Sequence, residues 1–136
     1  MAPAVGRKRR RGFITKRAMA RMEIVVIENA VIENAEIFIE DHGILTATLQ
    51  LKYERGCQGF GGLAFYSSGL KTQGGKNAMG LFVWRVFDVA GVSDWKSLKG
   101  KTIRVNHDDN RVHAIGHIIK DDWFYPTEEF AKAFGA

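Results

Sequence analysis

The sequence lacks the cysteine pairs that cross-link many small proteins and the hydrophobic segments that export a protein or anchor it in a membrane. Among 136 residues there is one cysteine, Cys57, so an intramolecular disulfide framework is excluded. There is no secretory hydrophobic segment and no apolar run of about 18 residues, so nothing predicts export or a membrane span. Apolar residues make up 46% of the chain, enough for one domain with a core. We therefore expect a single soluble domain in a reducing compartment, the cytoplasm.

Acidic residues are missing from the first 21 positions, which hold eight lysines and arginines. Because the whole chain has a net charge of +5, residues 22–136 carry −3 and the basic character belongs to this leader. We expect residues 1–21 to form a disordered basic leader. Binding of nucleic acid is the alternative, since clustered cations release counterions from a polyanion. The densest cluster consists of Arg7, Lys8, Arg9, Arg10 and Arg11.

Known catalytic signatures are also absent. The sequence has no HExxH, no nucleophile elbow, no Gly-Lys-Ser/Thr phosphate loop and no convincing pair of carboxylates. No cysteine-enzyme signature surrounds Cys57. His113 and His117 are four residues apart in a predicted strand, which separates their side chains by about 13 Å, too far to bind one ion. We therefore expect no enzymatic activity, no metal site and no cofactor.

What the sequence does contain, from residue 23 to residue 53, is a dense set of β-branched and aliphatic residues. This pattern predicts strands over residues 24–27, 31–32, 36–40 and 44–53. A tight turn is expected at Asp41-His42-Gly43. The pentapeptide Val26–Ala30 is repeated as Val31–Ala35, and its period of five matches neither a strand nor a helix. We attach no function to the repeat.

The second half of the chain predicts a helix between further strands. Residues 63–66 favour a strand and residues 67–76 a loop, after which Asn77 can cap a helix over residues 78–90 that ends at Gly91. This helix is apolar nearly all round, so we expect burial on two sides, with another subunit on one of them. Ser93 can cap a short turn that follows the helix.

A closing hairpin and a last helix complete the expected elements. Residues 101–105 and 111–119 resemble a hairpin across residues 106–110, and residues 127–134 favour a short helix. Residues 22–136 therefore predict a single α+β domain. Its expected parts are an antiparallel sheet of five or six strands, one central apolar helix and a short C-terminal helix.

The stretch from Gly56 to Gly62, GCQGFGG, is the densest glycine cluster of the chain. It is not a phosphate-binding fingerprint, because such loops lead into a helix N-terminus and this one lies between two predicted strands. A β-bulge or wide turn is one interpretation. The other is a bare backbone that a ligand approaches closely, with Gln58 as a polar contact and Phe60 as a stacking surface.

Three arginines outside the leader are candidates for binding an anion. Arg85 lies on the predicted central helix, and Arg104 and Arg111 lie in or next to the closing hairpin. The guanidinium fork suits phosphate oxygens, which makes anionic nucleotide binding a hypothesis. Ordinary salt bridges, Arg85 with Asp88 and Arg111 with Asp109, are the alternative.

Five segments together resemble a family of small phage and prophage proteins that we associate with the Thoeris anti-defence sponges. The likeness spans roughly residues 27–126 and excludes the leader. The segments are Ile39–Leu45 (IEDHGIL), Gly59–Gly62 (GFGG), Trp95–Lys101 (WKSLKGK), Ile103–Val105 (IRV) and Ala114–Ile118 (AIGHI).

This resemblance implies a binding protein and not an enzyme. Such sponges assemble from dimers into hexamers and sequester cyclic ADP-ribose signals made by bacterial TIR-domain immune enzymes. Some of them also hold cyclic oligonucleotides. The implied setting is the cytoplasm of an infected bacterium. The alternatives are a small nucleic-acid-binding protein and a structural or accessory phage protein.

The resemblance also implies a pocket between protomers, in which arginines meet a pyrophosphate and an aromatic ring stacks on adenine. Arg104, in the matching IRV segment, is the first candidate for the phosphates and Arg111 the second, with Arg85 as a further cation. The candidates for the base are Phe82 and Phe60, and Gln58 is the candidate for a polar edge.

Overall fold

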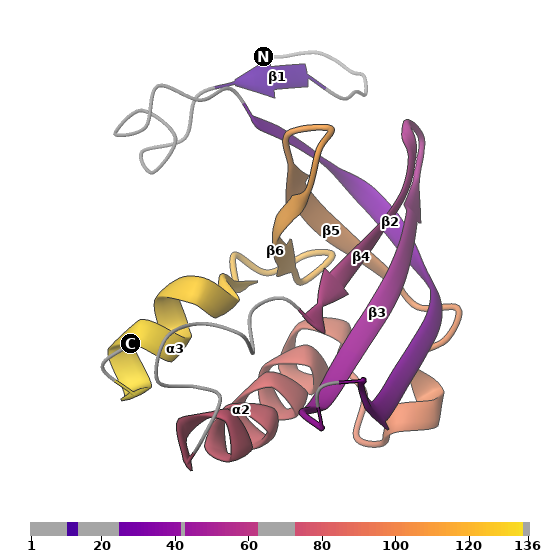
Figure 1. Cartoon of the computed structure of the whole chain (residues 1–136). Helices are drawn as coiled ribbons and strands as arrows, with labels where there is room; N and C mark the ends of the chain where they lie inside the picture. The colour runs from indigo at the N-terminus through magenta and orange to yellow at the C-terminus, as the bar shows by residue number, and fades with distance from the viewer. Residues whose placement is uncertain (1–10, 14–24, 42, 63–72, 135–136) are drawn as a thin grey trace.

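The fold is built on a curled antiparallel sheet, seen in a computed structural model that describes residues 11–13, 25–41, 43–62 and 73–134 (Figure 1). Six strands follow the order β4-β3-β2-β5-β6-β7, and a seventh, β1, pairs with the N-terminal end of β2. The strands are β1 (Arg11–Phe13), β2 (Val25–Ile39), β3 (Leu45–Tyr53), β4 (Gly56–Gly61), β5 (Thr102–His107), β6 (Val112–Gly116) and β7 (Trp123–Phe124).

Among the described residues, two α-helices and a 3-10 turn lie beside this sheet. They are α2 (Gln73–Ala90), η3 (Trp95–Ser97) and α3 (Pro126–Phe134). Figure 1 shows α2 and α3 on the same side of the curled sheet, where α2 contacts β3, β5, β6 and β7. The prediction of an α+β fold with one central and one short C-terminal helix is confirmed. No described helix is both long and apolar enough to span a bilayer.

One strand replaces the three short ones that were predicted before residue 41. β2 runs unbroken from Val25 to Ile39, and its pairing with β3 shifts register between Ile32 and Asn34. Because the five-residue period is odd, equivalent residues of the two copies would face opposite sides of a regular strand. Glu28 of the first copy is buried and its counterpart Glu33 is exposed. The register shift after Ile32 does not interrupt the strand.

The central helix starts earlier than predicted. α2 begins at Gln73, so residues 73–76 are helical and not part of a loop, and Asn77 lies inside the helix and does not cap it. Its two early glycines are poor helix formers, but the apolar turns that follow pack on the sheet and stabilise the helix. The predicted stop is correct: Gly91 has φ +72° and its N–H donates to the Phe87 carbonyl at 2.8 Å.

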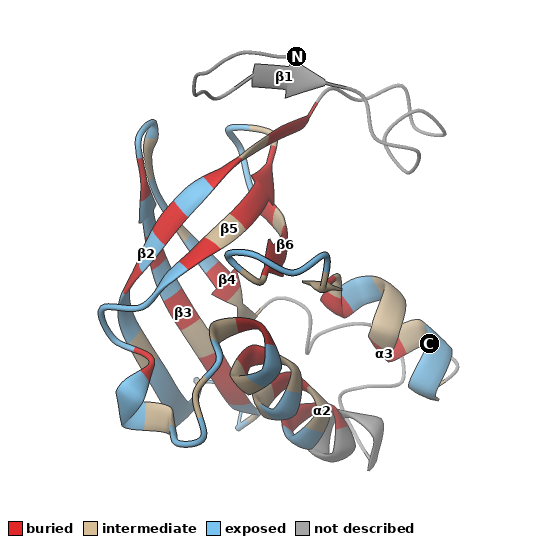
Figure 2. Cartoon of the chain, turned by 180° about the vertical axis from the view of Figure 1, so that it is seen from behind, coloured by how far each residue is buried: buried red, intermediate tan, exposed pale blue. Residues whose placement is uncertain are grey.

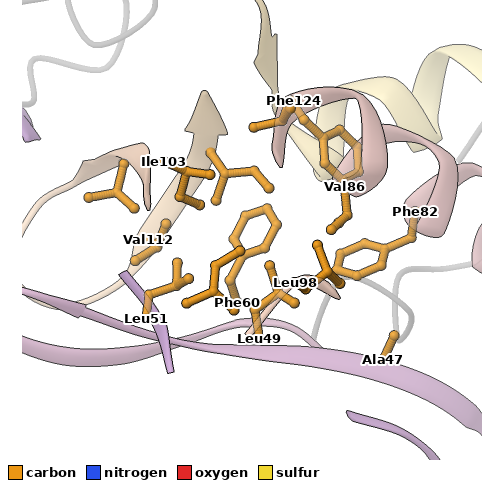
Figure 3. Close-up of a cluster of buried hydrophobic side chains, with 14 of the residues drawn as sticks. Ala47, Leu49, Leu51, Phe60, Phe82, Val86, Leu98, Ile103, Val112 and Phe124 are labelled. Atoms are coloured by element: carbon orange, nitrogen blue, oxygen red, sulfur yellow. The ribbon is translucent and has the colours of Figure 1, made fainter. Parts of the chain in front are cut away.

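The buried face of α2 forms one core with the sheet (Figures 2 and 3). The aromatic rings of Phe82 and Phe124 meet at 5.6 Å between centroids. On another side of the helix, Phe87 lies 6.4 Å from the ring of Trp95 in η3. Segments of the same chain thus occupy much of the surface that was expected to face another subunit, although Trp84 remains exposed.

Several smaller predictions need correction. The cap of η3 is Asp94 and not Ser93: its carboxylate accepts the N–H of Ser97 at 2.9 Å. β6 ends at Gly116, so His117 lies beyond the strand, and α3 starts at Pro126, a residue suited to a first helical position.

The basic leader is only partly described. Residues 11–13 form β1, so this part of the expected disordered leader is a strand. The predicted strand at residues 63–66, the loop at residues 67–72, and Arg7 to Arg10 lie outside the described residues.

Candidate functional site

The guanidinium of Arg85 is held by several neighbours in the chain. It projects from α2 and contacts Asp88 at 3.0 Å, Asp122 at 2.9 Å and Glu129 of α3 at 3.1 Å. It also donates to the carbonyl of Trp123 at 3.0 Å. Burial alone would lower the pKa of Arg85, but the hydrogen bonds to Asp122 and Asp88 outweigh burial and raise it. Arg85 therefore links the two helices, with four of its five N–H donors bound to the chain and its charge balanced by three carboxylates.

Arg104 supports a loop. Its Nε donates to the carbonyl of His117 and its Nη2 to the carbonyl of Lys120, both at 2.7 Å. Its guanidinium carbon lies 4.9 Å from the ring centroid of Trp123. These partners are neutral, so the positive charge is not cancelled by a carboxylate, but the side chain is held in place by the chain itself.

Arg111 differs from both. Its backbone N–H is held by the Asp108 carboxylate at 3.0 Å. The expected salt bridge with Asp109 is not made, because Asp109 pairs with Arg55. Within the described residues, the exposed Arg111 guanidinium forms no ion pair or side-chain hydrogen bond. It is the one arginine of the three candidates that remains available for an external anion.

Asp108 organises the turn that carries Arg111. One carboxylate oxygen accepts the N–H groups of Asn110 and Arg111, and the other lies 2.9 Å from Nε2 of His113. Burial alone would raise the pKa of this carboxyl, but these backbone and side-chain hydrogen bonds outweigh it and hold the pKa below its ordinary value. The result is a fixed turn between β5 and β6 that presents Arg111.

Phe60 and Phe82, the two candidates for stacking on a base, are core residues. Their rings are 4% and 0% exposed and lie 5.8 Å apart. Figure 3 shows both among the buried side chains of the core. Both rings therefore pack in the core, and neither presents a face to solvent on which a nucleotide base could stack.

A small cavity lies where the two sides of the curled sheet approach each other. β4 contacts β6, although three strands separate them in the sheet order. We call the cavity between them the seam pocket; its volume is about 70 Å³. It is lined by Gly59, Phe60, Gly61, Arg111, Val112, His113, Pro126 and Thr127.

The seam pocket brings the glycine stretch and one candidate arginine together. Gly59 and Gly61 line it from β4, which pairs only with β3 within the described residues. Gly61 has φ +105°, and a Cβ there would lie 2.8 Å from Cζ of Phe82, so only glycine fits. Gln58 is half-buried on β4 but does not line the pocket. Neither Arg85 nor Arg104 lines the pocket.

The interior holds a polar cluster that sequence reasoning missed. Glu28 and His107 are buried and contact each other at 2.6 Å, and the ring of Tyr53 stacks on His107 at 4.3 Å. Burial first, and then the charge of Glu28, raise the pKa of Tyr53. His107 was expected in a turn, but it is the last residue of β5. No motif marks this pairing, because its partners are 79 residues apart.

The described residues that could act in catalysis or metal binding, Cys57 among them, form no cluster of three or more metal-ligating side chains. Cys57 is an exposed free thiol whose Sγ lies 3.9 Å from Oε1 of Glu33. In the part of the chain that the structure describes, no group of three or more metal-ligating side chains could hold an ion.

Comparisons with protein-family models, with curated proteins and with solved structures found no match to this chain.

Proposed function

We propose that this protein binds a cyclic nucleotide signal, such as a cyclic ADP-ribose isomer or a cyclic oligonucleotide, and sequesters it without cleaving it. In this proposal it acts as an anti-defence protein in the cytoplasm of an infected bacterium. The observation that carries the proposal is the unpaired guanidinium of Arg111 beside the glycine edge of β4 at the seam pocket. A forked cation next to an exposed backbone edge suits a pyrophosphate.

The size of the pocket constrains how such a ligand would bind. Pockets for ligands of this class measure about 300–1,000 Å³, whereas the seam pocket measures about 70 Å³. The ligand would therefore lie across the mouth of the pocket, with its phosphates at Arg111 and its remaining surface against a second copy of the chain. The ring of His113, which lines the same pocket, replaces Phe60 and Phe82 as the candidate for stacking on the base.

Isothermal titration calorimetry with cyclic ADP-ribose isomers and cyclic oligonucleotides tests the proposal. Arg111→Ala should weaken binding by about tenfold to a hundredfold, the loss of one charge-assisted contact. Arg111→Lys should recover part of it, because the charge stays and the fork is lost. Lys101→Ala, which removes another exposed cation, is the matched control and should bind like the unchanged protein.

Two results would contradict the proposal. One is the absence of binding to every ligand tested by folded protein. The other is a bound ligand that chromatography finds cleaved after incubation, because the proposal has no catalytic step.

A second candidate function is nucleic-acid binding through the basic leader. It is favoured by the eight cations in the first 21 residues, and β1 attaches part of this leader to the sheet. It predicts salt-dependent binding of DNA or RNA that disappears when residues 1–21 are removed. Removing residues 1–10 alone, which takes four of the eight cations and leaves β1 in place, should weaken it.

A further inference from the structure

The C-terminal half of β2 has an open edge. On the side of β5, pairing stops at Val31 with Thr102. Beyond it, the N–H of Ile32 donates to the Lys101 carbonyl and the Ile32 carbonyl accepts the N–H of Gly100. From Asn34 to Ile39, β2 pairs only with β3 within the described residues. Among the strands that the structure describes, none lies beside this edge of the segment.

A hydrogen bond at the turn between β2 and β3 shows which backbone groups of β2 point away from β3. The N–H of Glu40 donates to the Ile44 carbonyl at 3.0 Å, toward the β3 side. Backbone groups alternate sides along a strand, so those of Ala35, Ile37 and Ile39 point away from β3. We call Ala35–Ile39 the β2 edge. It offers three donors and three acceptors in the spacing of an antiparallel partner.

The side chains at the β2 edge are apolar and accessible. Ile37 is 44% exposed, Phe38 41% and Ile39 64%, and Leu45 on β3, opposite Ile39, is 40% exposed. Proteins usually protect an open edge with lysine or proline, and neither residue occurs here. The one charged side chain within the edge is Glu36.

We propose that the β2 edge pairs antiparallel with the β2 edge of a second copy of this chain, so that two sheets become one sheet across a two-fold axis. A two-fold contact uses the same surface twice, and an antiparallel strand can meet that requirement by pairing with itself. The pairing satisfies the free backbone groups and covers Ile37, Phe38 and Ile39 in one step.

The charges select the register. Centring the pair on Ile37 places Glu36 opposite Phe38 of the second copy, so no acid faces another within the β2 edge; Glu33 and Asp41 face each other only beyond its two ends. Centring it on Glu36 would place that carboxylate opposite itself, and centring it on Phe38 would place Glu36 opposite Glu40. Like charges directly opposite destabilise a strand pair. The axis therefore passes through Ile37.

The helix α2, which the sequence favoured as a subunit interface, is a weaker candidate. Trp84 is 68% exposed, but it is a single large side chain on a helix whose backbone bonds are internal. The β2 edge offers both unpaired backbone groups and neighbouring apolar side chains. The two surfaces can be distinguished by substitution.

Sedimentation velocity of the full chain without ligand tests the interface. The unchanged protein should sediment as a dimer or a multiple of it, and Ile37→Lys should halve the assembly. Ile119→Lys, at another isoleucine that is 84% exposed, and Trp84→Lys should leave the mass unchanged. A monomeric unchanged protein, or an assembly that Trp84→Lys dissociates and Ile37→Lys does not, would overturn the proposal.

Disulfide trapping tests the register. With Cys57→Ser in the background, Ile37→Cys should give a covalent dimer on mild oxidation, because paired Cα atoms about 5.5 Å apart are within disulfide range. Val31→Cys is the control: it lies on the same strand, but β3 and β5 occupy both of its edges. Cross-linking at Val31 and not at Ile37 would contradict the register. Both measurements omit the nucleotide, so their outcome is independent of the proposed function.

Discussion

The carboxylate of Glu28 lies 2.6 Å from Nε2 of His107 inside the sheet, where both side chains are shielded from water. Nδ1 of the same ring accepts the N–H of Asp109 at 3.1 Å, so the neutral imidazole carries its proton on Nε2 and donates it to Glu28. This pair ties β2 to the end of β5, next to the turn that presents Arg111.

Removing the carboxylate should therefore destabilise the fold. Glu28→Ala leaves the Nε2–H of His107 buried without an acceptor and should lower the free energy of unfolding by about 3 kcal/mol, measured by urea denaturation. Glu28→Gln keeps an acceptor oxygen and should lose less. Glu33, the counterpart in the second pentapeptide, is exposed, and Glu33→Ala should change stability by less than about 0.5 kcal/mol. Equal losses for the two alanine variants would contradict this account.

The same pair of glutamates shows what could be predicted from the sequence and what could not. The β-rich composition correctly predicts an antiparallel sheet, because β-branched residues favour strands locally. Which glutamate points inward depends on which face of β2 packs on the core, and on a histidine 79 residues away. Neither is a local property, so no pattern within the strand predicts it.

The candidate site could also be predicted only in part from the sequence. Residue type alone correctly marks arginines as anion candidates, but the partners of each arginine depend on the fold. Asp122 and Glu129 form ion pairs with Arg85, and two loop carbonyls accept hydrogen bonds from Arg104. Asp109 pairs with Arg55, so Arg111 has no ion pair within the described residues. Aromatic character likewise does not tell a stacking residue from a core residue, as the burial of Phe60 and Phe82 shows.

The glycines of β4 differ in what they tolerate. A Cβ at Gly61 would overlap the Ala47 carbonyl and Phe82, and φ there is +105°, so Gly61→Ala should lower the free energy of unfolding by more than about 2 kcal/mol. A Cβ at Gly59 would meet only Nε2 of Gln50, at 3.8 Å, so Gly59→Ala should be neutral within about 0.5 kcal/mol. Thermal and urea unfolding check both, and a neutral Gly61→Ala would refute the close contact.

Replacing Arg85 should lower the free energy of unfolding, and replacing Arg111 should leave it nearly unchanged. Arg85→Ala leaves Asp122 and Glu129 near each other without their cation and should cost about 2 kcal/mol, while Arg85→Lys keeps the charge but cannot reach all of its partners. Arg111→Ala should change stability by less than about 0.5 kcal/mol. If Arg111→Ala unfolds the protein, its role is structural, and the binding experiment on that variant loses its meaning.

The turn at Asp108 should make the free energy of unfolding depend on pH. Its pKa is depressed in the folded protein, so this carboxylate contributes stability that is fully present above its unfolded pKa of about 4 and is lost as the pH falls through the lower folded value. Asp108→Asn keeps an oxygen for the N–H groups of Asn110 and Arg111 but removes the charge that faces His113. The difference in unfolding free energy between the unchanged protein and this variant should be largest near neutral pH and shrink below about pH 4. Urea denaturation at several pH values measures it, with Asp121→Asn, an exposed acid outside this turn, as the control. A difference that grows as the pH falls would show that Asp108 is not held in its charged form by the turn.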